Sequence, residues 1–180
     1  MRQLLLMTFS MFNNHPKIDI RPTAKDRRLI NFGWILVALN LLLVFSFYFE
    51  LPETIAIHFN LKGEADGYGS KNIIWMLPIL NIVLYYGMTV IATKVKPWNF
   101  NYPTKVNEKN APKLYAGAIS MLVYINVGIA FLFLLVSTHV ILVAKNIATI
   151  NLGWLILPTV ILLTVGPILT SIKMFKSPKS

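Results

Sequence analysis

The sequence predicts an all-α membrane protein, a bundle of four transmembrane helices with a small extracellular loop that contains β-structure. Three observations lead to this fold class. Four long stretches contain no charged residue, lysine and arginine gather in alternate connecting segments, and one polar interval alternates like a β-strand. The composition agrees, because 56% of the 180 residues are hydrophobic and only 13% are charged, against roughly 25% in soluble domains.

The four uncharged stretches are long enough to cross a bilayer as helices. The first, residues 30–49, would be about 30 Å long as an α-helix, which matches the hydrocarbon thickness. The others are residues 72–93, 114–137 and 152–172. Helix-breaking residues lie inside two of the four: Pro78, Pro158, Gly166 and Pro167. Membrane helices tolerate such residues, so we expect kinks there.

The charges predict the orientation of the chain. Fourteen of the 17 lysines and arginines lie in residues 1–29, 94–113 and 173–180. The other three are Lys62, Lys71 and Lys145. The positive-inside rule then puts both termini in the cytosol and residues 50–71 outside. The net charge of +10 follows from this topology, so it predicts anionic lipid at the inner face rather than a nucleic-acid partner.

The spans also divide the chain. We expect a basic cytosolic tail (1–29), a two-span membrane domain (30–93), a basic cytosolic loop (94–113), a second two-span hairpin (114–172) and a cytosolic tail (173–180). The first tail lacks the apolar core and cleavage site of a signal peptide. Aromatic residues mark both interfaces: Trp34, Trp98, Tyr102 and Tyr115 inside, and Tyr48, Trp75 and Trp154 outside.

The outer end of the third span allows two interpretations. The apolar residues Val140 to Ala144 extend the helix in one of them. In the other they pair with Ile147 to Ile150 as a small hairpin, because β-branched residues dominate both runs.

The polar interval 50–71 is predicted to form a strand and turns. Pro52 makes the chain leave the first span in an extended conformation. Residues 54–60 then alternate, with Ile55, Ile57 and Phe59 on one face and Ala56, His58 and Asn60 on the other, and a period of two indicates a strand. Gly63, Gly67 and Gly69 interrupt the return. Ser70 or Asn72 can cap the second span.

This interval resembles a known family. The matching residues are Leu51, Pro52, Ile57, His58, Phe59, Asn60, Gly63, Asp66, Gly67, Gly69, Ser70 and Lys71. Together they are similar to the signature of a bacterial membrane domain catalogued as domain of unknown function 1648, over residues 30–93. The family label itself implies no activity.

The same domain is similar to the N-terminal part of SdpI-type proteins. By that resemblance, such proteins give bacteria immunity to a secreted peptide toxin, bind the toxin outside and sequester a transcriptional repressor at the inner face. The chain departs from them after residue 93, because no SdpI-type signature occurs in residues 114–172. The resemblance implies a bacterial cytoplasmic membrane as the location.

The charged residues of the loop suggest a metal site only weakly. His58, Glu64 and Asp66 share the outer loop, and His139 ends the third span on the same side. Imidazoles and carboxylates are zinc ligands, but the spacing matches no metal motif. Hydrogen bonds within the turns explain these residues better, so we predict no metal. The chain contains no cysteine, which excludes thiolate sites and cysteine nucleophiles.

Three amides lie near the middle of three spans: Asn40, Asn81 and Asn126. Amides at one depth can meet in the bundle interior and specify helix packing. Alternatively they line a path for a ligand or ion. Packing is favoured, because no ionisable residue accompanies them and coupled transport usually needs one.

The inner loop 94–113 contains Trp98, Phe100 and Tyr102 between two prolines. This strip is either an interfacial anchor or a docking site for a cytosolic regulator. No nucleophile triad, Walker motif or dinucleotide motif occurs. The sequence therefore predicts a non-enzymatic protein without cofactors that senses, binds or gives immunity to an extracellular peptide. The alternative is a small permease or an accessory subunit of a transport complex.

Overall fold

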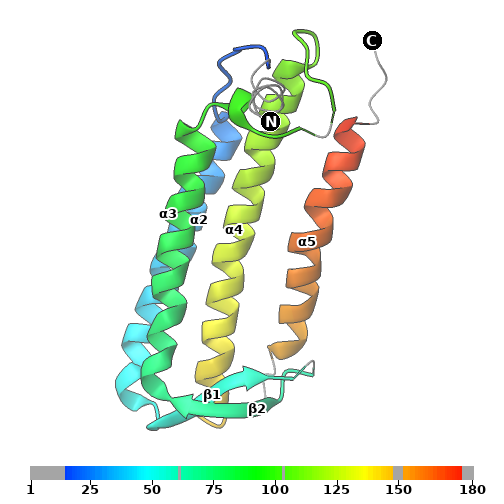
Figure 1. Cartoon of the computed structure of the whole chain (residues 1–180). Helices are drawn as coiled ribbons and strands as arrows, with labels where there is room; N and C mark the ends of the chain where they lie inside the picture. Colours follow the sequence, from blue (N-terminus) through cyan, green and yellow to red (C-terminus); the bar gives the residue numbers. More distant parts are fainter. Residues whose placement is uncertain (1–14, 61, 103, 148–151, 176–180) are drawn as a thin grey trace, which may run out of the picture.

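In the computed structural model, long helices stand side by side and a β-hairpin covers one end of the bundle (Figure 1). The structure describes residues 15–60, 62–102, 104–147 and 152–175, with side chains of the last helix up to Ile172. In this part of the chain the helices are α2 (Ala24–Phe47), α3 (Met76–Lys94), α4 (Ala111–Ala144) and α5 (Gly153–Phe175). All four are long and apolar enough to cross a membrane, which confirms the predicted fold class.

Helix α2 begins six residues before the predicted span. Its first turn is charged, and a capping box fixes its start. The hydroxyl of Thr23 accepts a hydrogen bond from the backbone N–H of Asp26 (3.1 Å), and the Asp26 carboxylate accepts one from the N–H of Thr23 (2.8 Å). A boundary drawn from apolarity alone misses such a turn, because capping residues are polar.

Helix α4 is 34 residues long, so the apolar run 140–144 extends it and this part of the hairpin alternative is wrong. The helix ends where Asn146 adopts a positive φ of 55°. The N–H of Asn146 donates to the Val143 carbonyl and the N–H of Ile147 to the Leu142 carbonyl, each at 3.0 Å. This pair of bonds is a Schellman motif. The second arm of the alternative, residues 148–150, lies outside the described residues.

The loop contains two strands. Strand β1 (Thr54–Phe59) pairs antiparallel with β2 (Ala65–Ser70). The alternation predicted for β1 is wrong after its second residue. Ala56 lies opposite Tyr68 and His58 opposite Gly67, so a β-bulge leaves Ile57 without an opposite residue. Ile55 and Ala56 are therefore both buried, while Ile57 is 44% exposed.

Three short 3₁₀ helices join these elements: η1 (Tyr48–Glu50), η2 (Lys71–Trp75) and η3 (Pro97–Asn99). The hydroxyl of Ser70 caps η2 by accepting from the N–H of Asn72 at 3.4 Å, one of the two predicted caps. Pro78 lies in the first turn of α3, where a missing N–H breaks few helical bonds. Pro158 and Pro167 lie inside α5.

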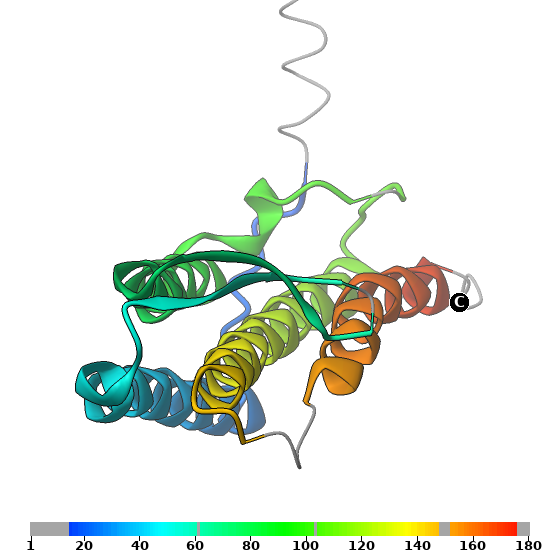
Figure 2. The same ribbon diagram turned by 90° about the horizontal axis from the view of Figure 1, so that it is seen from below.

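The core between α2, α3 and α4 is layered. The layer at the sheet end contains Val44, Ile74 and Val140, together with Leu51, Ile55 and Ile141. The middle layer consists of Leu36, Val37, Tyr85 and Ala130. The third layer consists of Ile30, Ala92 and Val123. Helix α5 packs along α4 and lies on the side of α4 away from α2 and α3 (Figure 2).

Candidate functional site

The tip of the hairpin is organised by Asn60. Its side-chain oxygen accepts hydrogen bonds from the N–H groups of Lys62 (2.8 Å) and Glu64 (3.1 Å). Its side-chain N–H donates to the Glu64 carboxylate at 2.8 Å. Gly63 has a φ of 77°, a conformation that other residues rarely adopt. Two of the predicted signature residues, Asn60 and Gly63, thus shape this turn.

His58 and Asp66 face each other across the strands. Nδ1 of His58 lies 2.5 Å from a carboxylate oxygen of Asp66, and the two side chains are 73% and 44% exposed. A Cβ added at Gly67 would lie 2.9 Å from the Cβ of His58, so a larger residue there would displace the imidazole. The pair is therefore a surface contact whose geometry depends on Gly67.

His139 connects the hairpin tip to α4. It is buried, and its Nε2 donates to the Gly63 carbonyl at 3.1 Å. Its ring lies 4.6 Å from the ring of Phe59, centroid to centroid. His139 thus contacts the underside of the turn, whereas the side chain of His58 is exposed. Among the described residues no three His, Asp or Glu side chains are grouped to hold a metal ion.

Two ion pairs hold the base of the hairpin. Lys71 lies 2.9 Å from the Glu53 carboxylate, and its backbone N–H donates to the Glu53 carbonyl. Lys145, just after α4, pairs with Glu50 at the end of η1. The side chain of Lys71 is only 16% exposed. Both lysines therefore bind acidic groups of the loop, while Pro52 lies exposed beside them.

The three predicted amides are all buried, but they occupy two different layers. Asn126 lies between the middle and third layers, where its N–H group donates to the Tyr85 carbonyl and the Thr89 hydroxyl, both at 3.1 Å. In the same region the Tyr85 hydroxyl donates to the Ile30 carbonyl at 2.8 Å. The hydroxyl of Tyr85 lies where a Cβ at Gly33 would stand, at 1.9 Å.

Asn40 and Asn81 lie about one turn nearer the hairpin. Asn40 falls between Leu36 and Val44 on α2, and Asn81 falls four residues before Tyr85 on α3. Both are completely buried, and within the described structure neither polar atom of either side chain has a hydrogen-bond partner. The predicted triple of amides is thus split, because residue depth in a span does not determine the layer in the packed bundle.

Ser137 lies between the same two apolar layers as Asn40 and Asn81. It is completely buried, and its hydroxyl has no partner among the described groups. It lies on α4 three residues before Val140 and seven after Ala130, between the sheet-end and middle layers. Sequence reasoning missed Ser137, although its spacing of eleven residues from Asn126 places both on one helical face.

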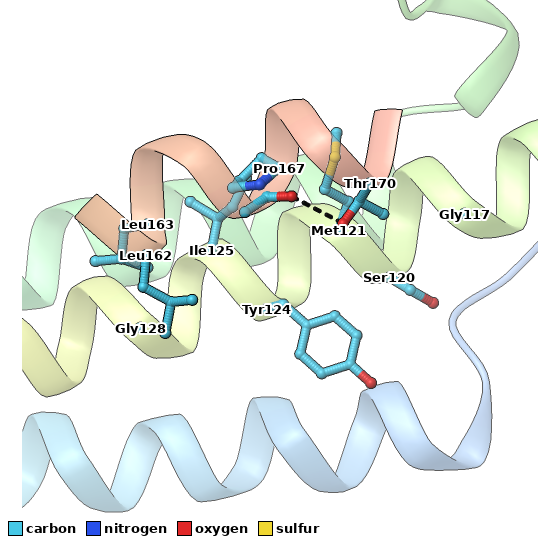
Figure 3. A pocket seen from close by; sticks show the side chains of 11 residues that line it. Gly117, Ser120, Met121, Tyr124, Ile125, Gly128, Leu162, Leu163, Pro167 and Thr170 are labelled. Carbon is cyan, nitrogen blue, oxygen red and sulfur yellow. Dashed lines mark hydrogen bonds between the residues drawn. The ribbon is translucent and has the colours of Figure 1, made fainter. Parts of the chain in front are cut away.

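A groove runs between α4 and α5 (Figure 3). It encloses about 460 Å³, and its α4 wall contains the small residues Gly117, Ser120 and Gly128. A Cβ at Gly128 would lie 2.2 Å from Leu163 of α5, so this glycine permits the close contact of the two helices. The hydroxyl of Thr170 donates to its own helix at the Gly166 carbonyl (2.9 Å). The lining includes no ionisable acid or base other than Tyr124, so the groove suits an apolar group.

The strip in the inner loop is covered by residues before α2. Nδ1 of His15 donates to the Trp98 carbonyl at 3.0 Å, and the Tyr115 hydroxyl donates to the Pro16 carbonyl at 2.9 Å. Burial raises the pKa of Tyr102, whose ring lies 5.5 Å from that of His15. The aromatic side chains of the loop therefore pack partly against the chain's own N-terminal segment.

An ion pair fastens the same segment. Lys96 donates to the Asp19 carboxylate at 2.8 Å, and this hydrogen bond holds the pKa of Asp19 below its usual value. Arg21 lies 3.6 Å from the same carboxylate. The segment before α2 is thus attached to the 94–113 loop by both polar and aromatic contacts.

Comparison with known proteins identifies one part of the chain. No curated protein and no solved structure matches it. The family model "Domain of unknown function (DUF1648)" matches residues 35–82, which run from the middle of α2 through the hairpin into α3. The match is shorter than the predicted range 30–93 and contains all the signature residues. Residues 35–82, with the hairpin near their centre, match this family model and are called the DUF1648 segment below.

Proposed function

We propose that this protein is a non-enzymatic integral membrane protein of the bacterial cytoplasmic membrane that binds an extracellular peptide through its hairpin. The observation that carries the proposal is the exposed strand surface of the DUF1648 segment. In the described part of the chain, β1 and β2 pair only with each other, so the outer edge of each strand has backbone groups that no strand satisfies. Extended peptides bind such edges by strand addition.

Side chains on the hairpin supply apolar contacts for such a peptide. Tyr68 is 64% exposed and Ile57 is 44% exposed. Gly69 leaves room for Ile57, because a Cβ there would lie 2.8 Å from the end of the isoleucine side chain. Exposed tyrosine at low conformational cost is a frequent anchor in binding sites.

The hairpin is also held rigidly enough to act as a preformed site. His139 supports its tip and Lys71 its base, through the contacts to Gly63 and Glu53. A preformed site loses less conformational entropy when a ligand binds. The excess of lysine and arginine at the opposite end of the bundle supports an extracellular location for the hairpin and cytosolic termini.

The resemblance to SdpI-type proteins suggests that the peptide is a secreted toxin and the role is immunity. The test compares survival of bacteria that express the full chain, or lack it, when exposed to such peptide toxins. We expect the chain to raise survival, and Tyr68→Ala to weaken peptide binding about tenfold, the typical effect of losing one anchor residue. Equal survival with and without the chain against every related toxin contradicts the immunity role.

A matched control is Tyr86→Ala. Tyr86 is exposed to a similar extent, 61%, but lies in α3 within a membrane span. The Tyr86→Ala variant should leave peptide binding and survival unchanged. If Tyr86→Ala lowers survival as much as Tyr68→Ala does, the hairpin is not the binding surface.

A transport role is the second candidate, and the buried amides of Asn40 and Asn81, which have no hydrogen-bond partner in the part of the chain that the structure describes, favour it. Polar groups inside a span often line a path. Uptake of small polar solutes into vesicles that contain the purified chain tests it. A rate equal to that of empty vesicles contradicts transport.

A further inference from the structure

Three helices of the core each place one uncharged polar side chain between the sheet-end layer and the middle layer. These are Asn40 of α2, Asn81 of α3 and Ser137 of α4, and each is completely buried. Five polar atoms, two from each amide and one hydroxyl oxygen, have no hydrogen-bond partner among the described groups. Buried polar groups in proteins are nearly always satisfied, so these side chains need an additional partner.

The helical spacing places the three side chains between the same two apolar layers. The apolar layer on the sheet side contains Val44, Ile74 and Val140, and the one on the other side contains Leu36, Tyr85 and Ala130. On each helix the polar residue falls between those two positions and on the same face, at spacings of three, four or seven residues.

The chemistry of the three side chains selects their ligand. Two amides and a hydroxyl both donate and accept hydrogen bonds, and none of them carries a charge. A bound ion would need a compensating charge at this depth, whereas water donates and accepts and is neutral. Buried water typically makes two to four hydrogen bonds to otherwise unsatisfied polar groups. The five polar atoms of the two amides and the hydroxyl supply enough partners for such a water.

We propose that Asn40, Asn81 and Ser137 form an internal hydration site in the middle of the three-helix core. Water there bridges α2, α3 and α4 and satisfies the two amides. The site lies directly beneath the apolar layer that contacts β1 through Ile55. The site therefore joins the DUF1648 segment, which supplies Asn40 and Asn81, to α4, which lies outside the matched residues.

The first test detects water at the amides. In the detergent-solubilised full chain, the side-chain amide protons of Asn40 and Asn81 should show nuclear Overhauser cross-peaks to water. In Asn81→Leu the cross-peak of Asn40 should disappear, because the shared site has lost one wall. The matched control Asn126→Leu makes the same change in the neighbouring layer and should leave that cross-peak in place.

The second test measures coupling by thermal unfolding. Asn40→Leu and Asn81→Leu should each lower the melting temperature, because each leaves the other groups unpaired. The double variant should melt higher than the sum of the two shifts predicts. Asn40→Leu and Asn126→Leu should instead be additive. If Asn81→Leu does not fold, Ser137→Ala makes a smaller change at the same site and should couple to Asn40→Leu.

Three results would overturn the proposal. One is the absence of water cross-peaks at both amides. This result overturns the proposal even if the melting shifts are coupled, because direct contact between the amides would then explain the coupling. Another is an Asn40 cross-peak that persists unchanged in Asn81→Leu. The third is additivity of the melting shifts of Asn40→Leu with both Asn81→Leu and Ser137→Ala.

Discussion

The three-helix core of α2, α3 and α4 differs sharply from the contact between α4 and α5, although all four helices are apolar enough to span a membrane. In the core, layers of buried side chains are joined by hydrogen bonds from Tyr85 and Asn126 to the neighbouring helices. In α5, Gly153 is the single buried residue among those described up to Ile172. The groove beside α4 remains open to an apolar occupant.

The comparison shows that apolarity decides whether a helix enters the membrane and not how firmly it packs there. Lipid chains are as apolar as leucine, so helix association depends on close fit and on interhelical hydrogen bonds. The core has a close fit, where Gly33 packs against Tyr85, and it has interhelical hydrogen bonds, which Tyr85 and Asn126 donate. The α4–α5 contact has the close fit of Gly128 and Leu163, and one weak polar contact from Ser171 to the Met121 sulfur at 3.6 Å.

Gly33→Ala should have the largest effect. The new Cβ would stand 1.9 Å from the Tyr85 hydroxyl. The tyrosine ring must therefore move, and the hydrogen bond from its hydroxyl to the Ile30 carbonyl breaks. Overpacking of this kind costs about 2–3 kcal/mol, measured as the free energy of unfolding in detergent.

The control for this change is Gly87→Ala, where nothing lies within 4 Å of the new Cβ. It should leave stability unchanged or raise it by about 0.5 kcal/mol, because alanine favours a helix over glycine. Equal losses in the two variants would contradict the close fit of α2 and α3.

Gly128→Ala should have a smaller and local effect. Its Cβ would meet the end of Leu163 at 2.2 Å, and a leucine side chain can turn aside at a cost of about 1 kcal/mol. We expect α5 to loosen from α4 while the core unfolds as before. The chain has no cysteine, so a bifunctional reagent joining cysteines introduced at Met121 and Ser171 reports the contact.

Adding Leu163→Ala to Gly128→Ala removes the clash and should restore the cross-linking yield. A yield that stays high in Gly128→Ala alone would mean that α5 does not depend on this fit. A drop in core stability equal to that of Gly33→Ala would remove the distinction between the two regions.

The smallest effect is expected at the Asp19–Lys96 pair, which attaches the segment before α2 to the inner loop 94–113. Lys96 lowers the pKa of Asp19 from its ordinary value of 3.8. The pair therefore stabilises the attached segment above about pH 3.8, and this stabilisation is lost as the pH falls through the lowered pKa. Hydrogen exchange of residues 15–23 should increase in acid relative to the Asp19→Asn variant, which lacks the titrating group. An identical pH response in both proteins would contradict the pair's role.

Sequence patterns predicted the elements whose cause is local. Four uncharged stretches predicted four helices, and Pro52 and the glycines of residues 50–71 predicted the turn-rich loop, with the family resemblance resting on the same interval. Local patterns failed where two segments meet. The bulge at Ile57 arises from pairing with β2, so the alternation within β1 did not reveal it.

The buried asparagines Asn40, Asn81 and Asn126 also show what local sequence patterns do not predict. Their burial followed from sequence, since polar residues avoid lipid, but their partners did not. Asn126 and Asn40 lie at similar depths in their spans, yet Asn126 donates to Thr89, whereas Asn40 has no hydrogen-bond partner among the described residues. The register between helices decides this, and a register is set by contacts such as Gly33 with Tyr85.

The sequence by itself determined that the chain has four membrane helices, a basic end, and a polar, turn-rich loop, because transfer free energy, charge and turn chemistry act residue by residue. Only the tertiary structure decided that His139 supports the hairpin, that α5 stands apart, and that Ser137 joins the amides. Those outcomes depend on distances between residues far apart in the chain, which close packing of the helices sets.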